Sequence, residues 1–425
     1  MTQVNKGAKT LDLNNYKGHS DMSVFDILEG RGFVQQYSSG VMDLLRGSGV
    51  SFYVGFDPTA DSLHAGSLVP IMAMAHLQRA GHRPIALVGG GTGMVGDPSG
   101  KEEARQLLTS ERIEHNKQAI KGQIGRFVSF EEGRGELVDN ADWLLPLNYI
   151  EFLREIGRHF SVNTMLTKAS VKARLERGLS FLEFNYQILQ AYDFLELYRR
   201  NGCRLQMGGD DQWGNMVAGT DLIRRVEGAE AHALTFPLLT TATGAKMGKT
   251  ANGAVWLDAD RLPVYDYYQY WINVDDRDVV RFLKLFTFLP LERIAELGAL
   301  KGAEIREAKR VLAFEATSVC HGKAAAERAE AGAKAAFSGG DAASAMPKYE
   351  TSLPVGLLSL LADSGLCQSR SDARRQVRGG AIKVAGEKIS AEDFEVTSDH
   401  LDDDGAVVVS RGKKKRVRVT MGASA

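Results

Sequence analysis

The chain is poor in cysteine and has no long apolar segment. Its 425 residues include only three cysteines, Cys203, Cys320 and Cys367, which lie far apart in the sequence. Three scattered cysteines supply neither a disulfide framework nor a four-cysteine zinc site, and they favour a reducing compartment. No apolar run approaches the roughly 20 residues that cross a bilayer, and residues 1–20 lack the apolar core of a signal peptide. We therefore expect a cytoplasmic protein that has no membrane partner.

An excess of charge of either sign is also missing. The 52 lysines and arginines are balanced by 53 aspartates and glutamates, which gives a formal net charge of −1 at pH 7. Attraction to nucleic acid must therefore come from local clusters of charge rather than from the field of the whole molecule. The chain is too long for one average domain, so we expect two or three.

The most informative stretch lies between residues 50 and 81. Residues 50–56 are β-branched and aromatic, which predicts a buried strand. Residues 57–59 (Asp-Pro-Thr) end that strand, and residues 68–80 are apolar at helical spacing. A strand, a tight turn and a helix N-terminus form the usual phosphate site of α/β proteins. The turn also carries His64 together with hydroxyl and carboxylate groups, which a purely structural turn does not require.

Residues 84–88 add a second apolar run and complete a β-α-β unit, which indicates a parallel sheet. We expect an α/β fold with a Rossmann-like, doubly wound parallel sheet, followed by an α-helical domain and a small α+β domain. The expected boundaries are a polar arm at 1–21, the sheet domain at 22–262, the helical domain at 263–336, a linker at 337–352 and the small domain at 353–425.

Residues 91–96 fit the pattern G-x-G-x-x-G after a strand, so a dinucleotide site has to be considered. No acidic residue at a strand end lies about 20 positions later, because that region is predicted to be a charged helix. The loop is not a Walker A motif either, since Gly100 and Lys101 are followed by Glu102. A flexible loop that lets the backbone approach a ligand is the simpler interpretation, and Asp97 at its end is better placed for chemistry.

Tyr186, Gln190 and Asp193 are spaced at i, i+4 and i+7 in a predicted helix at 181–200, so they share one face. The neighbouring residues are apolar, and a buried carboxylate without a partner is costly. This favours a row that faces a ligand over a stripe that faces solvent. Residues 208–212 follow a strand and open a helix with two aspartates, one of which can cap that helix. No further carboxylate stands at ligand spacing, so we expect no metal site.

Two groups of basic residues complete the candidates. Lys246 and Lys249 lie in a glycine-containing loop, where mobile lysines suit the charge that develops in a phosphoryl or adenylyl transition state. A surface pair that only aids solubility is the alternative. Basic runs at 369–378 and 411–418 suggest contacts to a phosphate backbone, whereas the acidic run at 402–404 means that only a polarised face would bind RNA.

Taken together, these segments resemble the bacterial tyrosyl-tRNA synthetases, a family of class I aminoacyl-tRNA synthetases, from about Met22 onward. The family signature H-x-G-H stands here as residues 64–67, and K-M-S-K-S stands as residues 246–250. Tyrosine-specific motifs are found at residues 53–59, 96–100, 186–193 and 208–215.

The signatures depart from the family pattern at three positions. Ser67 replaces the second histidine, and its hydroxyl can donate a hydrogen bond or cap the following helix. Gly248 and Thr250 replace serines in the lysine loop, where glycine adds flexibility and threonine keeps a hydroxyl.

The resemblance implies a reaction in two steps. The carboxylate of tyrosine attacks the α-phosphate of ATP, which gives tyrosyl-adenylate and pyrophosphate, and the tyrosyl group then passes to the 3′ end of tRNA(Tyr). Catalysis acts through positioning and charge, without a covalent enzyme intermediate. No tightly bound cofactor is implied, and Mg²⁺ accompanies ATP. The family is homodimeric.

The resemblance also assigns the residues. Tyr53 and Asp193 contact the phenol of tyrosine, and Asp97, Tyr186 and Gln190 hold its α-amino group. The catalytic residues are His64, Lys246, Lys249 and Thr59, with looser help from Lys101 and Arg105. The contacts to ATP and adenylate are Gly55, Asp57, His64, Gly66, Asp211, Gln212 and Lys249.

The resemblance likewise assigns the remaining domains. The helical block from 264 to about 335 is the anticodon-recognition region, and the module from about Leu353 is similar to a small RNA-binding domain shared with a ribosomal small-subunit protein.

Three alternatives remain open at this point. One is a nicotinamide-dependent oxidoreductase built on residues 91–96, and another is an RNA-binding protein whose catalytic domain is inactive. The third is a tryptophanyl enzyme. Tyr53 with Asp193 argues against it, because an indole offers one donor and has no phenol oxygen to accept a hydrogen bond.

Overall fold

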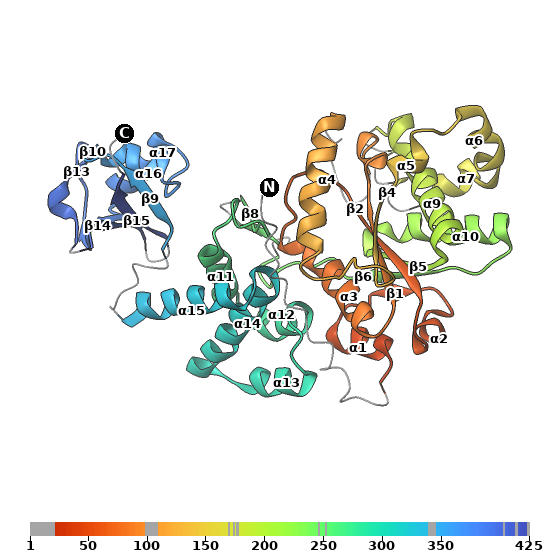
Figure 1. Cartoon of the computed structure of the whole chain (residues 1–425), viewed down its shortest axis with the longest axis horizontal. Coiled ribbons are helices and arrows are strands. Elements are labelled where there is room, and N and C mark those ends of the chain that lie inside the picture. Colours follow the sequence, from red (N-terminus) through yellow and green to blue (C-terminus); the bar gives the residue numbers. More distant parts are fainter. Residues whose placement is uncertain are drawn as a thin grey trace, which may run out of the picture. The chain divides into compact units, whose positions relative to one another are not determined.

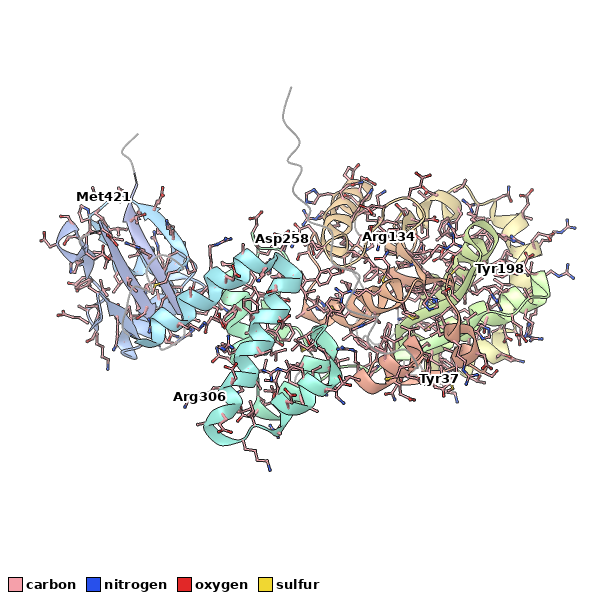
Figure 2. All side chains as sticks on the ribbon, turned by 60° about the horizontal axis from the view of Figure 1, so that its bottom comes forward. Tyr37, Arg134, Tyr198, Asp258, Arg306 and Met421 are labelled. Carbon is pink, nitrogen blue, oxygen red and sulfur yellow. The ribbon has the colours of Figure 1, made fainter. Side chains whose placement is uncertain are left out.

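A computed structural model of the chain describes residues 22–97, 109–168, 171–172, 175, 178–244, 247–250, 253–338, 346–402, 404–412 and 415–422. It divides into two compact units. The first contains Met1–Leu262 and Ile272–Cys320, and the second contains Pro263–Trp271 and His321–Ala425. The arm expected at 1–21 lies outside the described residues. Figure 2 draws the side chains of both units, with Arg306 in the first and Met421 in the second.

The first unit is built on a six-stranded sheet (Figure 1). Its strands lie in the order β1-β6-β5-β2-β3-β4, and all neighbours are parallel except β1 and β6. The strand bounds are β1 (Gln36–Tyr37), β2 (Ser51–Phe56), β3 (Arg83–Val88), β4 (Glu136–Asp139), β5 (Cys203–Gly209) and β6 (His232–Phe236). The parallel α/β sheet predicted from the β-α-β unit is therefore confirmed.

The local sequence explains the central β-α-β unit. All residues of β2 except Gly55 are buried, as expected for a strand covered on both faces. The crossover helix α3 (Leu68–Arg79) buries every side chain from Leu68 to Leu77 except Pro70, and it ends before Gly81. The expected bounds of 50–56 and 68–80 are thus correct to within one residue.

The first unit contains eleven further named α-helices among its described residues. They are α1 (Val24–Arg31), α2 (Val41–Arg46), α4 (Ser110–Ile124), α5 (Ala141–Leu144), α6 (Tyr149–Glu155), α7 (Val162–Leu166), α9 (Phe181–Asn201), α10 (Trp213–Glu227), α12 (Val279–Phe286), α13 (Leu291–Ala299) and α14 (Ile305–His321). The longest, α9, begins at a capping box between Ser180 and Glu183 and ends at Gly202 in the left-handed conformation.

The strand order places a crevice at the middle of the sheet. The chain leaves β2 toward β3 on one side, whereas β5 lies on the other side of β2. The loops that follow β2 and β5 therefore diverge at their carboxyl ends, which is where open α/β sheets bind ligands. Asp57 follows β2 and the Asp210-Asp211 pair follows β5, so both acidic turns lie at this crevice.

The second unit combines α11 (Val264–Ile272) and α15 (Lys323–Ser338) with a small α+β module. Its five-stranded sheet has the order β12-β11-β14-β15-β9. The elements are β9 (Lys348–Thr351), β10 (Val355–Gly356), α16 (Leu357–Asp363), α17 (Arg370–Arg378), β11 (Ile382–Val384), β12 (Glu387–Lys388), β13 (Glu395–Val396), β14 (Ala406–Arg411) and β15 (Lys415–Met421). Leucines of α16 and valines of β14 and β15 form its core.

The predicted end of the linker, residue 352, is wrong. Residues Lys348–Thr351 form β9, which pairs in parallel with β15 and so belongs to the sheet. The partner strand lies about 70 residues later, so no local pattern in the sequence reveals this pairing. Among the described helices, none is long and apolar enough to cross a membrane.

Candidate active site

Two adjoining pockets open at the carboxyl ends of β2 and β5. Both are lined by Gly55, Phe56, Asp57 and Pro70, so they meet at the turn after β2. The inner pocket adds polar side chains from separate segments: Tyr53, Thr92, Asp97, Asn140, Tyr186, Gln190, Asp193, Gln206 and Gln212. The outer pocket adds Thr59, Ser62, His64, Ser67 and Trp256.

The closed end of the inner pocket holds a buried carboxylate. Asp193 is 2% exposed, and each of its oxygens accepts one hydrogen bond. Trp143 Nε1 donates to Oδ1 at 2.7 Å, and Asn140 Nδ2 donates to Oδ2 at 2.9 Å. The hydroxyl of Tyr53 is buried nearby and has no hydrogen-bond partner in the part of the chain that the structure describes. A ligand that both donates and accepts at this end satisfies both groups.

The electrostatics of this end follow from its burial. Loss of water raises the pKa of Asp193 to about 7, although the hydrogen bonds from Asn140 and Trp143 pull that pKa down. Burial also raises the pKa of Tyr53 well above its ordinary value. Tyr53 therefore remains a neutral donor at every ordinary pH, while Asp193 titrates close to neutrality.

The predicted polar face of α9 does point into the inner pocket. Tyr186, Gln190 and Asp193 all line it, so the alternative of a solvent-facing stripe is wrong. Further along the pocket, Gln212 Nε2 donates to Asp97 Oδ2 at 2.7 Å. Asn215 Nδ2 donates to Gln190 Oε1 at 2.9 Å. Polar groups from the loop after β3, from α9 and from the turn after β5 thus converge on one space.

The outer pocket is built on the turn that carries His64. Its Nδ1 accepts the backbone N–H of Gly66 at 3.0 Å, which caps the short 3₁₀ helix η2 (Ala65–Ser67). The capping role considered for Ser67 is wrong, because its side chain makes no cap hydrogen bond to α3. Ser67 and Thr59 both line the outer pocket. Gly55 has open space where a Cβ would stand, so a ligand can approach the backbone there.

The two signature segments lie against each other. A Cβ on Gly248 would stand 2.7 Å from the backbone nitrogen of Gly66, and Gly248 has a φ of +78°. Glycine at this position is therefore explained by close packing and left-handed backbone, beyond the flexibility expected from the sequence. Lys246, Lys101 and Arg105 lie outside the described residues. Lys249 is described only through its backbone, which pairs with Ala254 between β7 (Lys249–Thr250) and β8 (Gly253–Ala254).

The two aspartates after β5 have different surroundings. Asp210 Oδ1 accepts from Gln36 at 2.7 Å and from Thr235 at 2.8 Å, so it ties the turn to β1 and β6. Asp211 does not line either pocket formed by the described residues, although Gln212 beside it lines the inner one. No group of three or more potential metal ligands was found among the described residues.

The glycine-rich loop at 91–96 does not form a pyrophosphate cradle. The N–H groups of Gly91 and Thr92 both point at Asn140 Oδ1, at 2.8 and 3.4 Å. The N–H groups of residues 93–96 donate to backbone carbonyls within the loop. With these donors occupied, the interpretation as a dinucleotide site loses its physical basis. The loop instead contributes Thr92 and Asp97 to the inner pocket.

Asn140 and Trp143 were missed by reasoning from the sequence. Asn140 connects three parts of the site, because its Nδ2 also donates to Thr92 Oγ1 at 2.9 Å. The available signal was weak: Asp139 and Asn140 follow a strand end, as polar site residues often do in parallel sheets. Trp143 lies in α5, and from the sequence alone a tryptophan there would be assigned to the hydrophobic core.

The parallel sheet with two adjoining pockets at its switch point belongs to a class I aminoacyl-tRNA synthetase, as the comparison with known families shows. The family described as "tRNA synthetases class I (W and Y)" matches residues 46–338. The family described as "Tyrosine--tRNA ligase SYY-like C-terminal domain" matches residues 340–419.

The relatives narrow the class further. A tyrosine--tRNA ligase of Clostridium tetani is 51% identical over 94% of this chain and 99% of its own length. That of Desulfosudis oleivorans is 52% identical over 93% and 98%. A solved, C-terminally truncated mitochondrial tyrosyl-tRNA synthetase of Aspergillus nidulans is 30% identical, with a TM-score of 0.66, over 76% of this chain and 96% of that one. The chain belongs to the tyrosine--tRNA ligases, which confirms the family resemblance.

Proposed function

We propose that the protein activates L-tyrosine with ATP to tyrosyl-adenylate and then transfers the tyrosyl group to tRNA(Tyr). One observation carries the substrate: the closed end of the inner pocket presents the buried hydroxyl of Tyr53 beside a buried carboxylate, Asp193. That hydroxyl has no hydrogen-bond partner among the described residues. A phenol donates to the carboxylate and accepts from the hydroxyl, so it satisfies both groups. Phenylalanine satisfies neither, and it would leave them buried without partners.

Residues farther along the inner pocket suit the amino-acid backbone. Asp97, Tyr186 and Gln190 offer oxygen acceptors for an α-ammonium group. The hydrogen bonds from Gln212 to Asp97 and from Asn215 to Gln190 support these assignments, because they hold two of the acceptors in fixed orientations. The substrate carboxylate then lies toward Asp57, where the inner pocket meets the outer one.

We assign the outer pocket to ATP. The carboxylate oxygen of tyrosine forms a bond to the α-phosphorus, and the bond from that phosphorus to the pyrophosphate oxygen breaks. His64, Thr59, Lys246 and Lys249 stabilise the charge on the α-phosphate and on the departing pyrophosphate. Gly55 leaves open space for the nucleotide near the backbone. At Gly66 a Cβ would stand 2.7 Å from the His64 ring, so glycine there makes room for that ring.

The remaining contacts of the nucleotide and its metal ion are assigned in the same way. Gln212 and Asp211 are assigned to the ribose and carboxylate side of the adenylate. Mg²⁺ enters as part of the ATP substrate rather than as a resident ion.

The decisive experiment is tyrosine-dependent exchange between ATP and pyrophosphate, followed by charging of tRNA(Tyr). We expect exchange with tyrosine and little with phenylalanine or tryptophan, and transfer of tyrosine to tRNA(Tyr). Binding of RNA without any exchange would favour the alternative of an inactive RNA-binding protein. Preferential exchange with tryptophan would contradict the substrate assignment.

The pH dependence of tyrosine binding provides an independent check. The phenol needs an ionised acceptor, and the pKa of Asp193 is about 7 in the empty pocket. A rise of pH through 7 ionises Asp193, so the affinity for tyrosine should increase, and below pH 7 it should fall by up to about tenfold per pH unit. Titration with tyrosine by calorimetry between pH 5.5 and 8.5 measures this slope. Phenylalanine serves as the control ligand, because its binding should not strengthen as Asp193 ionises.

We further propose that the protein works in the cytoplasm as a homodimer and that its C-terminal module contacts the tRNA backbone. The chain has only three cysteines, all of them buried, as suits a reducing compartment. The arginines of α17 and the basic start of β15 supply local positive charge that the net charge of the chain lacks. Large apolar side chains are exposed on consecutive elements from α5 to α9: Leu145, Tyr149, Ile150, Val162, Phe181 and Leu182.

Such an apolar surface marks a protein interface, so one charged substitution should disrupt the dimer. Phe181 is 71% exposed at the first position of α9, and Phe181→Asp places a carboxylate at a helix N-terminus, where it does not destabilise the helix. We expect sedimentation velocity to show a dimer for the wild type and a monomer for Phe181→Asp. Leu238→Asp, an exposed apolar position outside this surface, should remain dimeric. An unchanged dimer in the Phe181 variant would place the interface elsewhere.

A further inference from the structure

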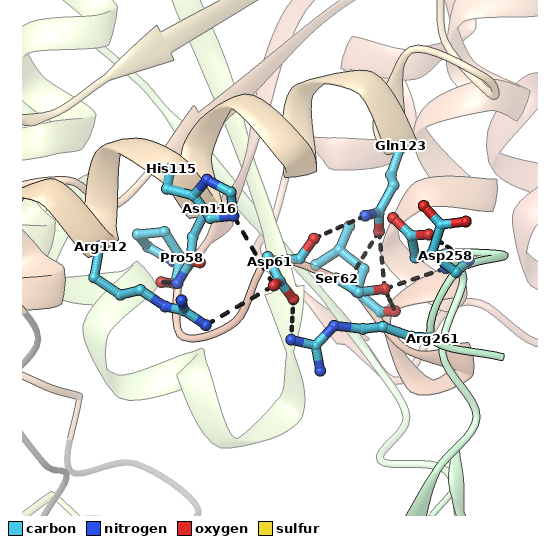
Figure 3. A network of polar contacts seen from close by, with 11 residues as sticks. Pro58, Asp61, Ser62, Arg112, His115, Asn116, Gln123, Asp258 and Arg261 are labelled. Atoms are coloured by element: carbon cyan, nitrogen blue, oxygen red, sulfur yellow. Dashed lines mark hydrogen bonds and ion pairs between the residues drawn. The ribbon is translucent and has the colours of Figure 1, made fainter. Parts of the chain in front are cut away.

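A cluster of polar contacts holds the outer side of the turn that carries His64 (Figure 3). Asp61 stands three residues before His64, and its carboxylate faces two guanidinium groups and one imidazole. Arg261 donates to it directly, Arg112 Nη2 lies 3.8 Å from Oδ2, and His115 Nε2 lies 4.0 Å from Oδ2. The hydrogen bond from Arg261 is the main reason that the pKa of Asp61 is lowered, so Asp61 is ionised at neutral pH.

Arg261 belongs to the segment that follows the lysine loop. Within that segment, residues 255–258 run beside residues 63–65. Ala65 N–H donates to Val255 O at 2.8 Å, Leu257 N–H donates to Leu63 O at 2.9 Å, and His64 forms a β-bridge with Trp256. Trp256 also lines the outer pocket. The segment after the lysine loop therefore forms a wall of that pocket directly against the His64 turn.

Buried contacts fix the turn itself to α4. Gln123 is 2% exposed, and its Oε1 accepts Leu63 N–H at 2.8 Å while its Nε2 donates to Asp61 O at 3.1 Å. Ser62 Oγ accepts Asp258 N–H at 3.2 Å (Figure 3). These contacts are buried or partly buried and keep the turn folded, so the fold does not depend on the more exposed ion pair.

Arg261 connects the two segments through its side chain. Its guanidinium lies over the ring of Trp256, 4.9 Å from the ring centre. The same guanidinium contacts Asp61 in the His64 turn. The side chains of Arg261 and Asp61 are 35% and 24% exposed. An ion pair with this exposure contributes little to global stability. It does restrain the angle between the segment and the turn, because the stacked ring and the carboxylate fix the guanidinium at two points.

We propose that Asp61 and Arg261 are positioning residues that hold the base of the lysine loop against the His64 turn, so that the loop meets ATP in the outer pocket. The lysine loop enters this wall directly, because Val255 N–H donates to Gly248 O at 2.8 Å. A shift of the wall therefore moves the loop relative to His64. The inference rests on the proposed function, since the affected step is adenylate formation.

The test compares Asp61→Asn, Arg261→Gln and the double variant in the exchange assay. We expect kcat/KM for ATP to fall about three- to tenfold in each, while KM for tyrosine is unchanged because the inner pocket is untouched. The double variant should lose no more of its kcat/KM for ATP than the more impaired of the two single variants, because both residues act through one contact. Arg261→Lys keeps the charge but loses the planar stack, so it should retain part of the activity.

Arg277→Gln is the matched control, because it breaks another partly exposed arginine–aspartate pair, with Asp275, away from both pockets. Its kinetics should equal those of the wild type. Unchanged kinetics in the Asp61 and Arg261 variants, or additive losses in the double variant, would contradict the inference. Equal losses of kcat/KM for ATP and for tyrosine, together with a lower thermal unfolding midpoint, would also contradict the inference, since they indicate only a structural role. If the wild type showed no exchange at all, the proposed function itself would fail.

Discussion

Asp193→Ala is expected to remove most of the preference for tyrosine over phenylalanine while ATP binding stays intact. The carboxylate lies beside the Tyr53 hydroxyl at the closed end of the inner pocket, and it is held there by Asn140 and Trp143. A hydrogen bond to a charged group is worth about 1.5–3 kcal/mol, so selectivity should fall about ten- to a hundredfold. Tyrosyl-tRNA synthetases are themselves the standard example of this kind of discrimination. The ratio of kcat/KM for the two amino acids in the exchange assay measures it.

Tyr53→Phe is the companion to this variant. The Tyr53 hydroxyl is buried and has no partner within the described part of the chain, so its removal should leave the free protein equally stable or slightly more stable. Tyrosine binding should nevertheless weaken about tenfold, because the phenol loses its donor. A stabilised protein with weaker tyrosine binding separates a ligand-facing hydroxyl from a structural one. Unchanged selectivity in both variants would show that the phenol does not bind at this end.

His64→Asn is expected to slow adenylate formation strongly without preventing folding. The Nδ1 of His64 caps η2 by accepting Gly66 N–H, and an asparagine oxygen can replace that acceptor. The rest of the imidazole, which faces the outer pocket, has no counterpart in asparagine. Loss of one positioned donor to a developing charge typically costs about 10²- to 10³-fold in rate. Pre-steady-state measurement of adenylate formation tests this, with tyrosine affinity as the internal control.

His64→Ala separates the cap from the catalytic role. It should show the same loss of rate together with a lower free energy of unfolding, by about 1 kcal/mol for a lost cap. If His64→Asn retained the wild-type rate while His64→Ala did not, the histidine would act only as a cap. Ser67→Ala should have a smaller effect than either variant, because the Ser67 side chain caps nothing in α3.

Local sequence patterns predicted the elements around the site well. The β-branched run at 50–56 and the apolar helical spacing at 68–80 appear as β2 and α3, because period and composition are properties of neighbouring residues. The same reasoning placed Tyr186, Gln190 and Asp193 on one face of a helix. That geometry required only the 3.6-residue repeat, and the helix has the expected face toward the pocket.

Contacts between distant segments were beyond such reasoning. Asn140 and Trp143 reach Asp193 only because β4 lies at the edge of the sheet next to β3, an order that no local pattern specifies. The different roles of Asp210 and Asp211 likewise depend on β1 and β6, which bring Gln36 and Thr235 to Asp210. The strand β9 was mistaken for part of a linker because its partner, β15, lies far along the chain.

By itself, the sequence determined the family, the parallel sheet and the residue types of the site, since motifs and periodicity are written in short stretches of chain. The tertiary structure alone decided how those stretches meet. It joined two pockets at Asp57, packed Gly248 against Gly66 and set Asp61 against Arg261. These contacts connect residues up to about 200 positions apart, and only the strand order and the packing of loops over the sheet bring them within bonding distance.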